Sequence, residues 1–281
     1  MGKAILVFQT DFTYKEGAVA SMYGVVKSVD RELEIISATH EIPQFDTWSA
    51  SYRLWQYTKF WPAGTVFVSV VDPGVGTARK ASVALTTDGY YIVTPDNGSL
   101  THFMHFSKIK EIREIDESVN RLKGKDTEEV SIFHGRDLFS YCAARLAAGI
   151  ITYEETGPQY PLEKIVTHNI EQPDAENGKV TGIIEIADPN FGNAWTNIPL
   201  KTMKKAGFNY GEKYNVIIRN NDKTFFSEKV LFEKSFGFVS KGEPVLYNNE
   251  LNNIGIAVSM GSFIKRYNAG FGADWKVEIS K

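Results

Sequence analysis

Short apolar runs alternate with helical patterns along the first half of the chain. Runs rich in apolar and β-branched residues predict strands at Ala4–Phe8, Leu33–Thr39, Thr65–Val71, Ala81–Thr86, Tyr90–Thr94 and Ile109–Ile115. Apolar residues at helical spacing predict helices at Gly17–Asp30, from Asp46 or Thr47 to about Phe60, at Leu100–Phe106 and at Arg136–Ala148. Asp88-Gly89 is typical of a tight hairpin. We therefore expect a layered α/β domain around a mixed, mostly parallel sheet.

The pattern changes after about Thr167, where helical spacing nearly disappears. Short strands separated by Gly, Asn and Asp are predicted at Val180–Ala187, Tyr214–Arg219, Lys223–Val230, Pro244–Tyr247, Ile254–Ser259 and Trp275–Ile279. The polar stretch Gln172–Lys179 is typical of a linker. We expect an α/β domain over residues 1–168, a linker over 169–179 and a smaller all-β, barrel-like domain over 180–281.

Composition narrows the class of protein. A chain of 281 residues with 43% hydrophobic content can bury the cores of two domains. Its net charge of −3, with no long basic run, argues against nucleic acid as a partner. We expect no membrane span and no signal peptide, because apolar runs are short. The single cysteine, Cys142, excludes an internal disulfide and fits a reducing, cytoplasmic compartment.

The stretch from Asp72 to Arg79 is the strongest candidate for chemistry. It follows the apolar strand Thr65–Val71 and turns on Pro73 and two glycines. In open α/β sheets, ligands bind beyond the carboxyl ends of the strands. A carboxylate and a guanidinium there can serve catalysis, although a structural ion pair bracing the turn is the simpler alternative.

A histidine in a second turn extends this set. Phe133-His134-Gly135-Arg136-Asp137 enters a predicted helix, and His134 can titrate near neutrality. A carboxylate beside an arginine stays ionised, so Asp72 can orient a histidine or a water molecule. Asp137 is expected to complement the positive end of the helix dipole.

Further polar residues follow other strands. Asp11, after the first strand, can accept hydrogen bonds from two ribose hydroxyls, or it can cap the next helix. Asp188, Phe191 and Asn193 fall in one turn-rich stretch that can hold an ammonium group and a purine, or form an ordinary β-turn. The turn Pro95–Gly98 is expected to be structural, with side chains that satisfy their own backbone. Neither GxGxxG nor a P-loop motif is present.

Together these segments resemble the S-adenosyl-L-methionine (SAM) hydroxide adenosyltransferases, adenosine-forming SAM hydrolases related to fluorinases and chlorinases. The resemblance covers essentially the whole chain. It is carried by Thr10-Asp11-Phe12, His40-Glu41-Ile42-Pro43, Val70–Thr77, Pro95-Asp96-Asn97-Gly98, Phe133–Asp137, and Phe191-Gly192-Asn193 with Thr196-Asn197.

The resemblance implies a homotrimer whose active sites lie between one subunit's N-terminal domain and a neighbour's C-terminal domain. It implies a catalytic set of Asp72, Arg79 and His134, with no metal and no cofactor, SAM being the substrate. Halogenating relatives have tyrosine at the Asp72 position, and the fluorinase has serine at the Gly135 position. The resemblance therefore favours water or hydroxide as the nucleophile.

Substrate contacts are also carried over by position. Asp11 would hold the ribose diol, Asp188 the methionine ammonium and Asn193 the adenine edge. The other implied substrate-binding residues are Phe45, Phe133, Phe191, Val258 and Met260. Phe45 stands where fluorinases have tryptophan, and Glu250-Leu251 replaces a Ser-Arg pair of the fluorinase.

The expected reaction is in-line displacement by water at C5′ of SAM, which gives adenosine and methionine. The sequence leaves open whether Asp72 or His134 is the base. Three alternatives remain: SAM-dependent halide transfer, a non-catalytic protein that binds adenosine or SAM, and a metal-dependent hydrolase that uses Asp72, His134 and Asp137.

Overall fold

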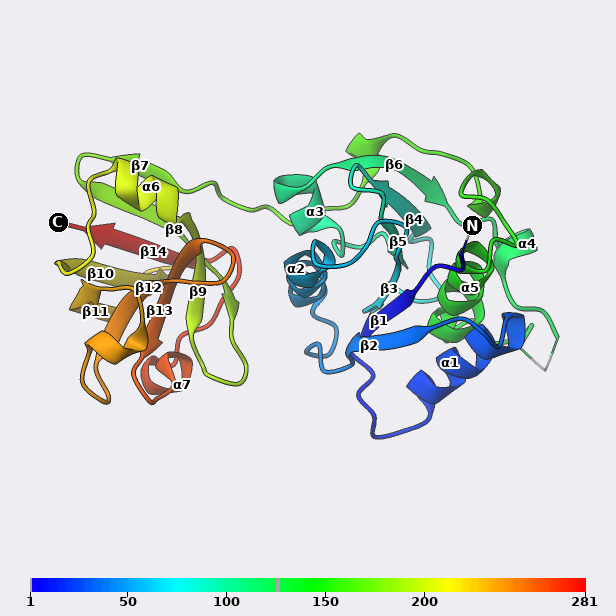
Figure 1. Cartoon of the computed structure of the whole chain (residues 1–281), viewed down its shortest axis with the longest axis horizontal. Helices are drawn as coiled ribbons and strands as arrows, with labels where there is room; N and C mark the ends of the chain where they lie inside the picture. The colour runs from blue at the N-terminus through cyan, green and yellow to red at the C-terminus, as the bar shows by residue number, and fades with distance from the viewer. Residues whose placement is uncertain (1, 125–126) are drawn as a thin grey trace. The chain divides into compact units, whose positions relative to one another are not determined.

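The chain divides into two compact units in the computed structural model, which describes residues 2–124 and 127–281. We call residues 1–168 the N-terminal unit and residues 169–281 the C-terminal unit (Figure 1). Within the described residues, no helix is long and apolar enough to cross a membrane.

A six-stranded sheet forms the centre of the N-terminal unit, in the order β2-β1-β3-β5-β4-β6. The strands are β1 (Leu6–Thr10), β2 (Ile35–Thr39), β3 (Val66–Val70), β4 (Ala81–Thr86), β5 (Tyr91–Pro95) and β6 (Ile109–Glu114). Only β4 runs against its neighbours, so the sheet is mixed and mostly parallel, as the sequence predicts.

Helices cover both faces of this sheet (Figure 1). They are α1 (Ala18–Val29), α2 (Thr47–Thr58), α3 (Thr101–Phe106), α4 (Glu117–Asn120), η1 (Gly135–Ser140), α5 (Tyr141–Ala147), and the short turns η2 (Glu154–Thr156) and η3 (Leu162–Lys164). Alternate residues of β1 enter different cores: Leu6 and Phe8 pack with residues of α1 and α5, whereas Val7 packs with residues of α2 and α3. Burial on both faces explains why the central strands are mostly apolar.

The helix predicted at Arg136–Ala148 begins differently from the expectation. Its first part, η1, is a π-helix, and only α5 is α-helical. The hydroxyl of Ser140 donates to the carbonyl of Gly135 at 2.7 Å within this wider turn. Such π-segments occur frequently at functional sites.

The C-terminal unit is a closed barrel of seven strands, because β14 pairs with both β10 and β8. Its strands are β8 (Lys179–Ala187), β9 (Ala194–Pro199), β10 (Lys213–Asn220), β11 (Lys223–Phe232), β12 (Pro244–Asn248), β13 (Asn253–Val258) and β14 (Trp275–Ser280). Short elements complete the unit: β7 (Asp174–Glu176), α6 (Leu200–Lys205), η4 (Phe236–Phe238) and α7 (Phe263–Tyr267). Strand β7 pairs with β8 and lies inside the segment expected to be a linker.

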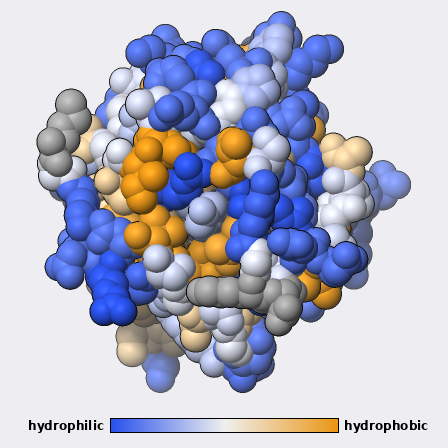
Figure 2. Space-filling model, turned by 90° about the vertical axis from the view of Figure 1, so that its right-hand side faces the viewer, coloured by the Kyte–Doolittle hydropathy of each residue, from blue (hydrophilic) through white to orange (hydrophobic). Residues whose placement is uncertain are grey.

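Hydrophilic side chains cover most of the face at the right-hand end of Figure 1, where α1, α4 and α5 lie. Apolar side chains gather near the centre of this face (Figure 2). Exposed apolar residues of the N-terminal unit include Val119, Ile132 and Ile150. Most of the apolar content is instead buried in the cores of the two units.

Candidate active site

The sheet topology brings Asp72 and Arg79 together. Strands β3 and β5 run parallel, and β4 runs antiparallel to β5. The carboxyl ends of β3 and β5 therefore meet the start of β4 at one edge of the sheet. Asp72 follows β3 and Arg79 precedes β4, so the loop between them begins and ends at this edge.

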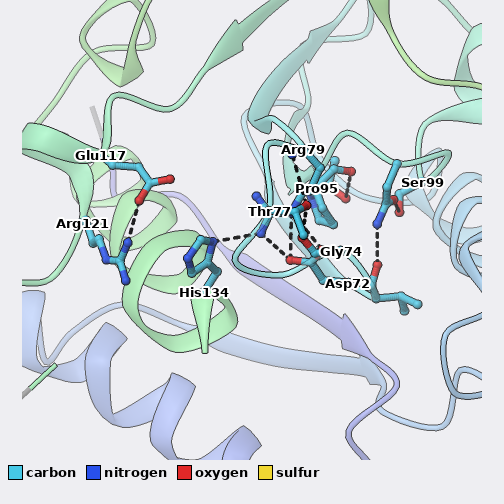
Figure 3. Close-up of polar contacts among 12 residues, drawn as sticks. Asp72, Gly74, Thr77, Arg79, Pro95, Ser99, Glu117, Arg121 and His134 are labelled. Atoms are coloured by element: carbon cyan, nitrogen blue, oxygen red, sulfur yellow. Dashed lines mark hydrogen bonds and ion pairs between the residues drawn. The ribbon is translucent and has the colours of Figure 1, made fainter. Parts of the chain in front are cut away.

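The three predicted catalytic side chains form one hydrogen-bonded set (Figure 3). Nε of Arg79 donates to both carboxylate oxygens of Asp72, at 2.9 and 3.1 Å, and Nη2 donates to Oδ2 as well. The same Nη2 lies 2.9 Å from Nδ1 of His134. The side chains of Asp72 and Arg79 are 5% and 9% exposed, so the charges face each other with little water around them.

This geometry fixes the proton on His134. A guanidinium has only donors, so Nδ1 of His134 must accept from Arg79 and the ring proton resides on Nε2. Burial lowers the pKa of His134, and the positive charge of Arg79 lowers it further. Glu117 and Arg121, which form an ion pair beside the ring, have opposing effects on that pKa (Figure 3). His134 is therefore a neutral imidazole with Nε2–H available as a donor.

One aromatic ring contacts the set, and two more pack around the neighbouring Gly135 turn. The guanidinium carbon of Arg79 lies 5.2 Å from the ring centre of Phe139, at a distance suited to a cation–π contact. Phe133 and Phe12 pack edge to face with ring centres 6.0 Å apart. A Cβ added to Gly135 would lie 3.2 Å from Cε2 of Phe12, so the backbone of η1 approaches this ring closely. No sequence motif indicates the contact of Phe139 with Arg79, because Phe139 lies in a π-helix that the sequence pattern does not predict.

Asp11 lies in the loop after β1 and is partly buried. Its Oδ2 accepts a hydrogen bond of 2.9 Å from the backbone N–H of Phe45, a residue with a φ of +66°. Burial raises the pKa of Asp11, hydrogen bonds lower it, and the negative charge of Asp72 raises it. Asp11 is thus within electrostatic reach of Asp72. The ring of Phe45 is 61% exposed.

The predicted residues of the C-terminal unit gather at one end of the barrel. The end of β8, the start of β9 and the end of β13 meet there, because Ala194 pairs with both Ala187 and Ile256. Oδ1 of Asp188 accepts from the backbone N–H groups of Asn190 and Phe191, which is an Asx-type turn.

Exposure differs strongly among these residues. Asn193 and Val258 are buried, whereas Phe191 and Met260 are 72% and 84% exposed. The side chain of Asn193 lies near Tyr247 and acts to lower its pKa, and the hydroxyl of Tyr247 accepts a hydrogen bond from Nε1 of Trp195 at 2.7 Å. Tyr247 was not predicted from the sequence, because it lies in a different strand from Asn193.

A metal centre finds no support in the described residues. Within 2–124 and 127–281, no three His, Cys, Asp or Glu side chains are arranged to hold an ion. Asp137, the third ligand of the metal-dependent alternative, is fully buried and forms an ion pair with Arg136 at 2.6 Å.

Comparison with known proteins identifies the family. The model of the SAM hydroxide adenosyltransferase N-terminal domain matches residues 6–157, and that of the C-terminal domain matches residues 182–276. The chain belongs to the SAM hydroxide adenosyltransferase family. The motifs that carry the resemblance in the sequence lie within these two matched ranges.

Relatives within this family carry two different names. An "(R)-S-adenosyl-L-methionine hydrolase" of Thermus thermophilus is 29% identical over 91% of this chain and 92% of its own length. One of the same name from Methanocaldococcus jannaschii is 37% identical over about half of each chain, 50% and 52%. A fluorinase of Actinoplanes is 27% identical over 95% of both chains.

A solved structure shows the same architecture. An uncharacterized conserved protein from Thermotoga maritima superposes with a TM-score of 0.88 and 33% identity, over 99% of this chain and 100% of the other. This chain is therefore similar over most of its length to a relative named as a hydrolase and to one named as a fluorinase, and the residues at its site bear on which activity it has.

Proposed function

We propose that this protein hydrolyses SAM to adenosine and L-methionine. The main support for this proposal is that Asp72, Arg79 and His134 form one hydrogen-bonded set at the edge of the sheet, in which the ion pair is almost fully buried. Membership of a family with relatives named (R)-SAM hydrolase supports SAM as the substrate.

The reaction is an in-line displacement at the ribose C5′. A bond forms between the water oxygen and C5′ while the bond from C5′ to sulfur breaks, and its electron pair stays on sulfur. The sulfonium leaves as the neutral thioether of methionine, so no general acid is required. The water loses one proton to a base and becomes the 5′-hydroxyl of adenosine. Fixing one water in line with C5′ removes a large part of the entropic barrier.

The tautomer of His134 favours Asp72 as the base. Nδ1 of His134 already accepts from Arg79, and Nε2 carries the ring proton, so neither nitrogen is free to take another. Oδ1 of Asp72 accepts one hydrogen bond from Arg79 and keeps a second lone pair, whereas Oδ2 accepts two. Positioned proton transfer of this kind typically contributes about 10²–10⁴-fold to the rate. Arg79 and Nε2–H of His134 would stabilise the developing hydroxide.

Binding would use both units. Asp11 would accept from the ribose diol, with Phe45 and Phe133 beside the nucleoside. Asp188 would hold the methionine ammonium and Asn193 the adenine edge, with Phe191, Val258 and Met260 around them. The proposal includes a homotrimer in which the two halves of each site come from neighbouring subunits. The exposure of Phe45, Phe191 and Met260 supports it, because binding of substrate or a neighbour would bury these rings and the thioether.

Two features favour water over halide as the nucleophile. The carboxylate of Asp72 would repel an anion at the position where water must bind. A Cβ at Gly135 would lie 3.2 Å from the ring of Phe12, so the serine of fluorinases would require this ring to shift by a few tenths of an ångström. The proposal also needs no metal and no cofactor, and it assigns the protein to the cytoplasm.

Hydrolysis in ¹⁸O-labelled water tests the proposal directly. The purified protein is incubated with SAM, and adenosine and methionine are quantified by mass spectrometry. We expect equal amounts of both, with the label in the 5′-hydroxyl of adenosine and none in methionine. Label in methionine, or no product despite tight SAM binding, would contradict it.

Parallel incubations address the alternatives. With chloride or fluoride present, we expect no 5′-halo-adenosine, and its formation would indicate halide transfer. Full turnover after exhaustive chelation is expected, whereas loss that added metal restores would indicate a metal-dependent hydrolase.

A further inference from the structure

The turn Pro95–Gly98, expected from the sequence to satisfy only its own backbone, bonds to a distant segment. Nδ2 of Asn97 donates to the backbone carbonyl of Val71 at 3.0 Å, across 26 residues of sequence. Val71 directly precedes Asp72 in the chain. Ser99 donates its hydroxyl to Oδ1 of Asn97 at 2.7 Å, which fixes the orientation of the amide (Figure 3).

The same turn also holds the other end of the catalytic loop. The backbone N–H of Asp96 donates to the carbonyl of Lys80 at 2.8 Å, and Lys80 directly follows Arg79. The strand order β3-β5-β4 explains this bridge, since residues after β5 lie between the end of β3 and the start of β4. The loop from Asp72 to Arg79 is therefore tied at both ends to two consecutive residues.

The turn is itself firmly anchored. Asp96 is 4% exposed, and its carboxylate accepts from the hydroxyl of Tyr160 and the backbone N–H of Val166, each at 2.9 Å. Tyr160 is in turn hydrogen-bonded to Ser82 on β4. Asn97 thus extends from a rigid support toward the carbonyl beside Asp72.

We propose that Asn97 is a positioning residue, which holds Asp72 in register with Arg79 and His134 through the carbonyl of Val71. The inference rests on the proposed function, because it assigns Asn97 to the hydrolytic site. Asn97 acts through the backbone and need not touch the substrate. Loss of its donor would let the start of the loop shift while Asp96 still holds the end. Since a displacement of about 1 Å can cost roughly 10²-fold in rate, the effect should fall on kcat.

Three substitutions at this position separate the donor from the shape of the side chain. N97A removes the donor without adding charge, and N97S replaces the amide with a hydroxyl one bond closer to the backbone. N97D removes the donor but keeps the size and the bond from Ser99. All three are expected to lower kcat about 10²-fold while KM for SAM and the affinity for adenosine change by less than about 3-fold. The matched control is T94V, because Thr94 is buried on β5 and its hydroxyl makes only a 3.4 Å contact to Pro95. T94V should keep the wild-type kcat.

The outcomes distinguish the inference from the proposed function. A wild-type protein that releases no adenosine would refute the proposed function. An active wild type with full kcat in N97A and N97S would overturn the role of Asn97 and leave the proposed function standing. An equal loss of kcat in T94V would also overturn the role of Asn97, since any change to a buried side chain near the end of β5 would then have the same effect.

A readout that needs no turnover is the crystal structure of N97A. The inference requires a shift of Asp72 or a longer distance between Arg79 and His134 than the present 2.9 Å. Superposable loops in N97A and the wild type would refute it whether or not the protein hydrolyses SAM.

Discussion

The ion pair of Asp72 and Arg79 offers the sharpest test, through a double-mutant cycle with D72N and R79Q. Both substitutions remove the charge; D72N keeps the shape of the side chain, whereas R79Q leaves a shorter side chain that ends in a neutral amide. R79Q leaves a carboxylate that is 5% exposed without its cation, and D72N leaves a guanidinium that is 9% exposed without its anion. The double variant places two neutral amides in the same space.

The geometry sets the size of the expected effect. Two unit charges about 4 Å apart interact by roughly 4 kcal/mol at the effective dielectric constant of about 20 that suits protein sites. Breaking a buried pair from one side typically costs about 3–5 kcal/mol, which agrees. We therefore expect each single variant to lose about 3–5 kcal/mol of unfolding free energy, and the double variant to lose clearly less than the sum of the two.

Turnover should follow a different pattern from stability. If the three side chains act as a unit, each single variant and the double variant should lose about 10²–10⁴-fold in kcat to a similar extent. Urea unfolding followed by fluorescence measures stability, and adenosine release measures turnover. H134N serves as a comparison, because it removes the neutral partner and leaves the ion pair intact.

Two results would refute this reasoning. Stability losses that add within about 0.5 kcal/mol would show that the pair is not coupled, since independent sites behave in that way. Unimpaired adenosine release in D72N would remove Asp72 from the catalytic set.

Three further predictions concern other parts of the chain. Asp11→Ala should weaken adenosine binding about 10- to 100-fold in calorimetry, as expected for a lost hydrogen bond to a charged group; unchanged affinity would contradict the ribose assignment. Gly135→Ser should cost about 1–3 kcal/mol through crowding against Phe12 and should lower hydrolysis without producing halo-adenosine; full stability and rate would contradict it. Burial raises the pKa of Glu185 to about 8, so the folded state holds this proton more tightly than the unfolded state. The contribution of Glu185 to stability should therefore be fully present below about pH 4.5 and be lost, by about 3–5 kcal/mol, as the pH rises to 8. E185Q should flatten this dependence in urea midpoints measured across that range, and an unchanged slope would show that Glu185 is not its source.

Much of the site was predictable because local sequence and sheet order agree. One short loop joins Asp72, just after the end of β3, to Arg79, just before the start of β4, and both strands are recognisable in the sequence. The predicted hairpin of β4 and β5 makes β4 run back along the sheet, which brings its start close to the end of β3. His134 was identified as a candidate by its turn, and its hydrogen bond with Arg79 joins it to the pair. The tautomer of His134 could not be predicted, since it depends on which ring nitrogen accepts the hydrogen bond from Arg79.

The barrel shows where sequence reasoning failed. The sequence pattern predicts no strand at Ala194–Pro199, because the stretch from Ala187 to Asn197 is rich in Asn and Gly and is typical of a turn. In the structure Ala194–Pro199 is β9, and the polar side chains of Thr196 and Asn197 are buried and bonded to backbone groups of other strands or segments. Closure of the barrel between β8 and β14 joins segments about a hundred residues apart, which no local pattern reports.

The electrostatics of the site suit a substrate that enters as a cation and leaves as neutral products. Asp72 and Arg79 cancel each other's charge, and contact with Arg79 keeps His134 neutral, so the set carries no net charge. A protonated His134 would add a positive charge beside the arriving sulfonium and would also lose its bond to the guanidinium. Arg79 therefore has two effects in the proposed mechanism: it holds the carboxylate that accepts the proton, and it keeps the imidazole in the form that donates to hydroxide. One guanidinium bonds to both Asp72 and His134, so a shift of the loop from Asp72 to Arg79 would disturb both contacts. Asn97 bonds to the carbonyl of Val71, next to the start of this loop, and this bond connects it to the catalytic set.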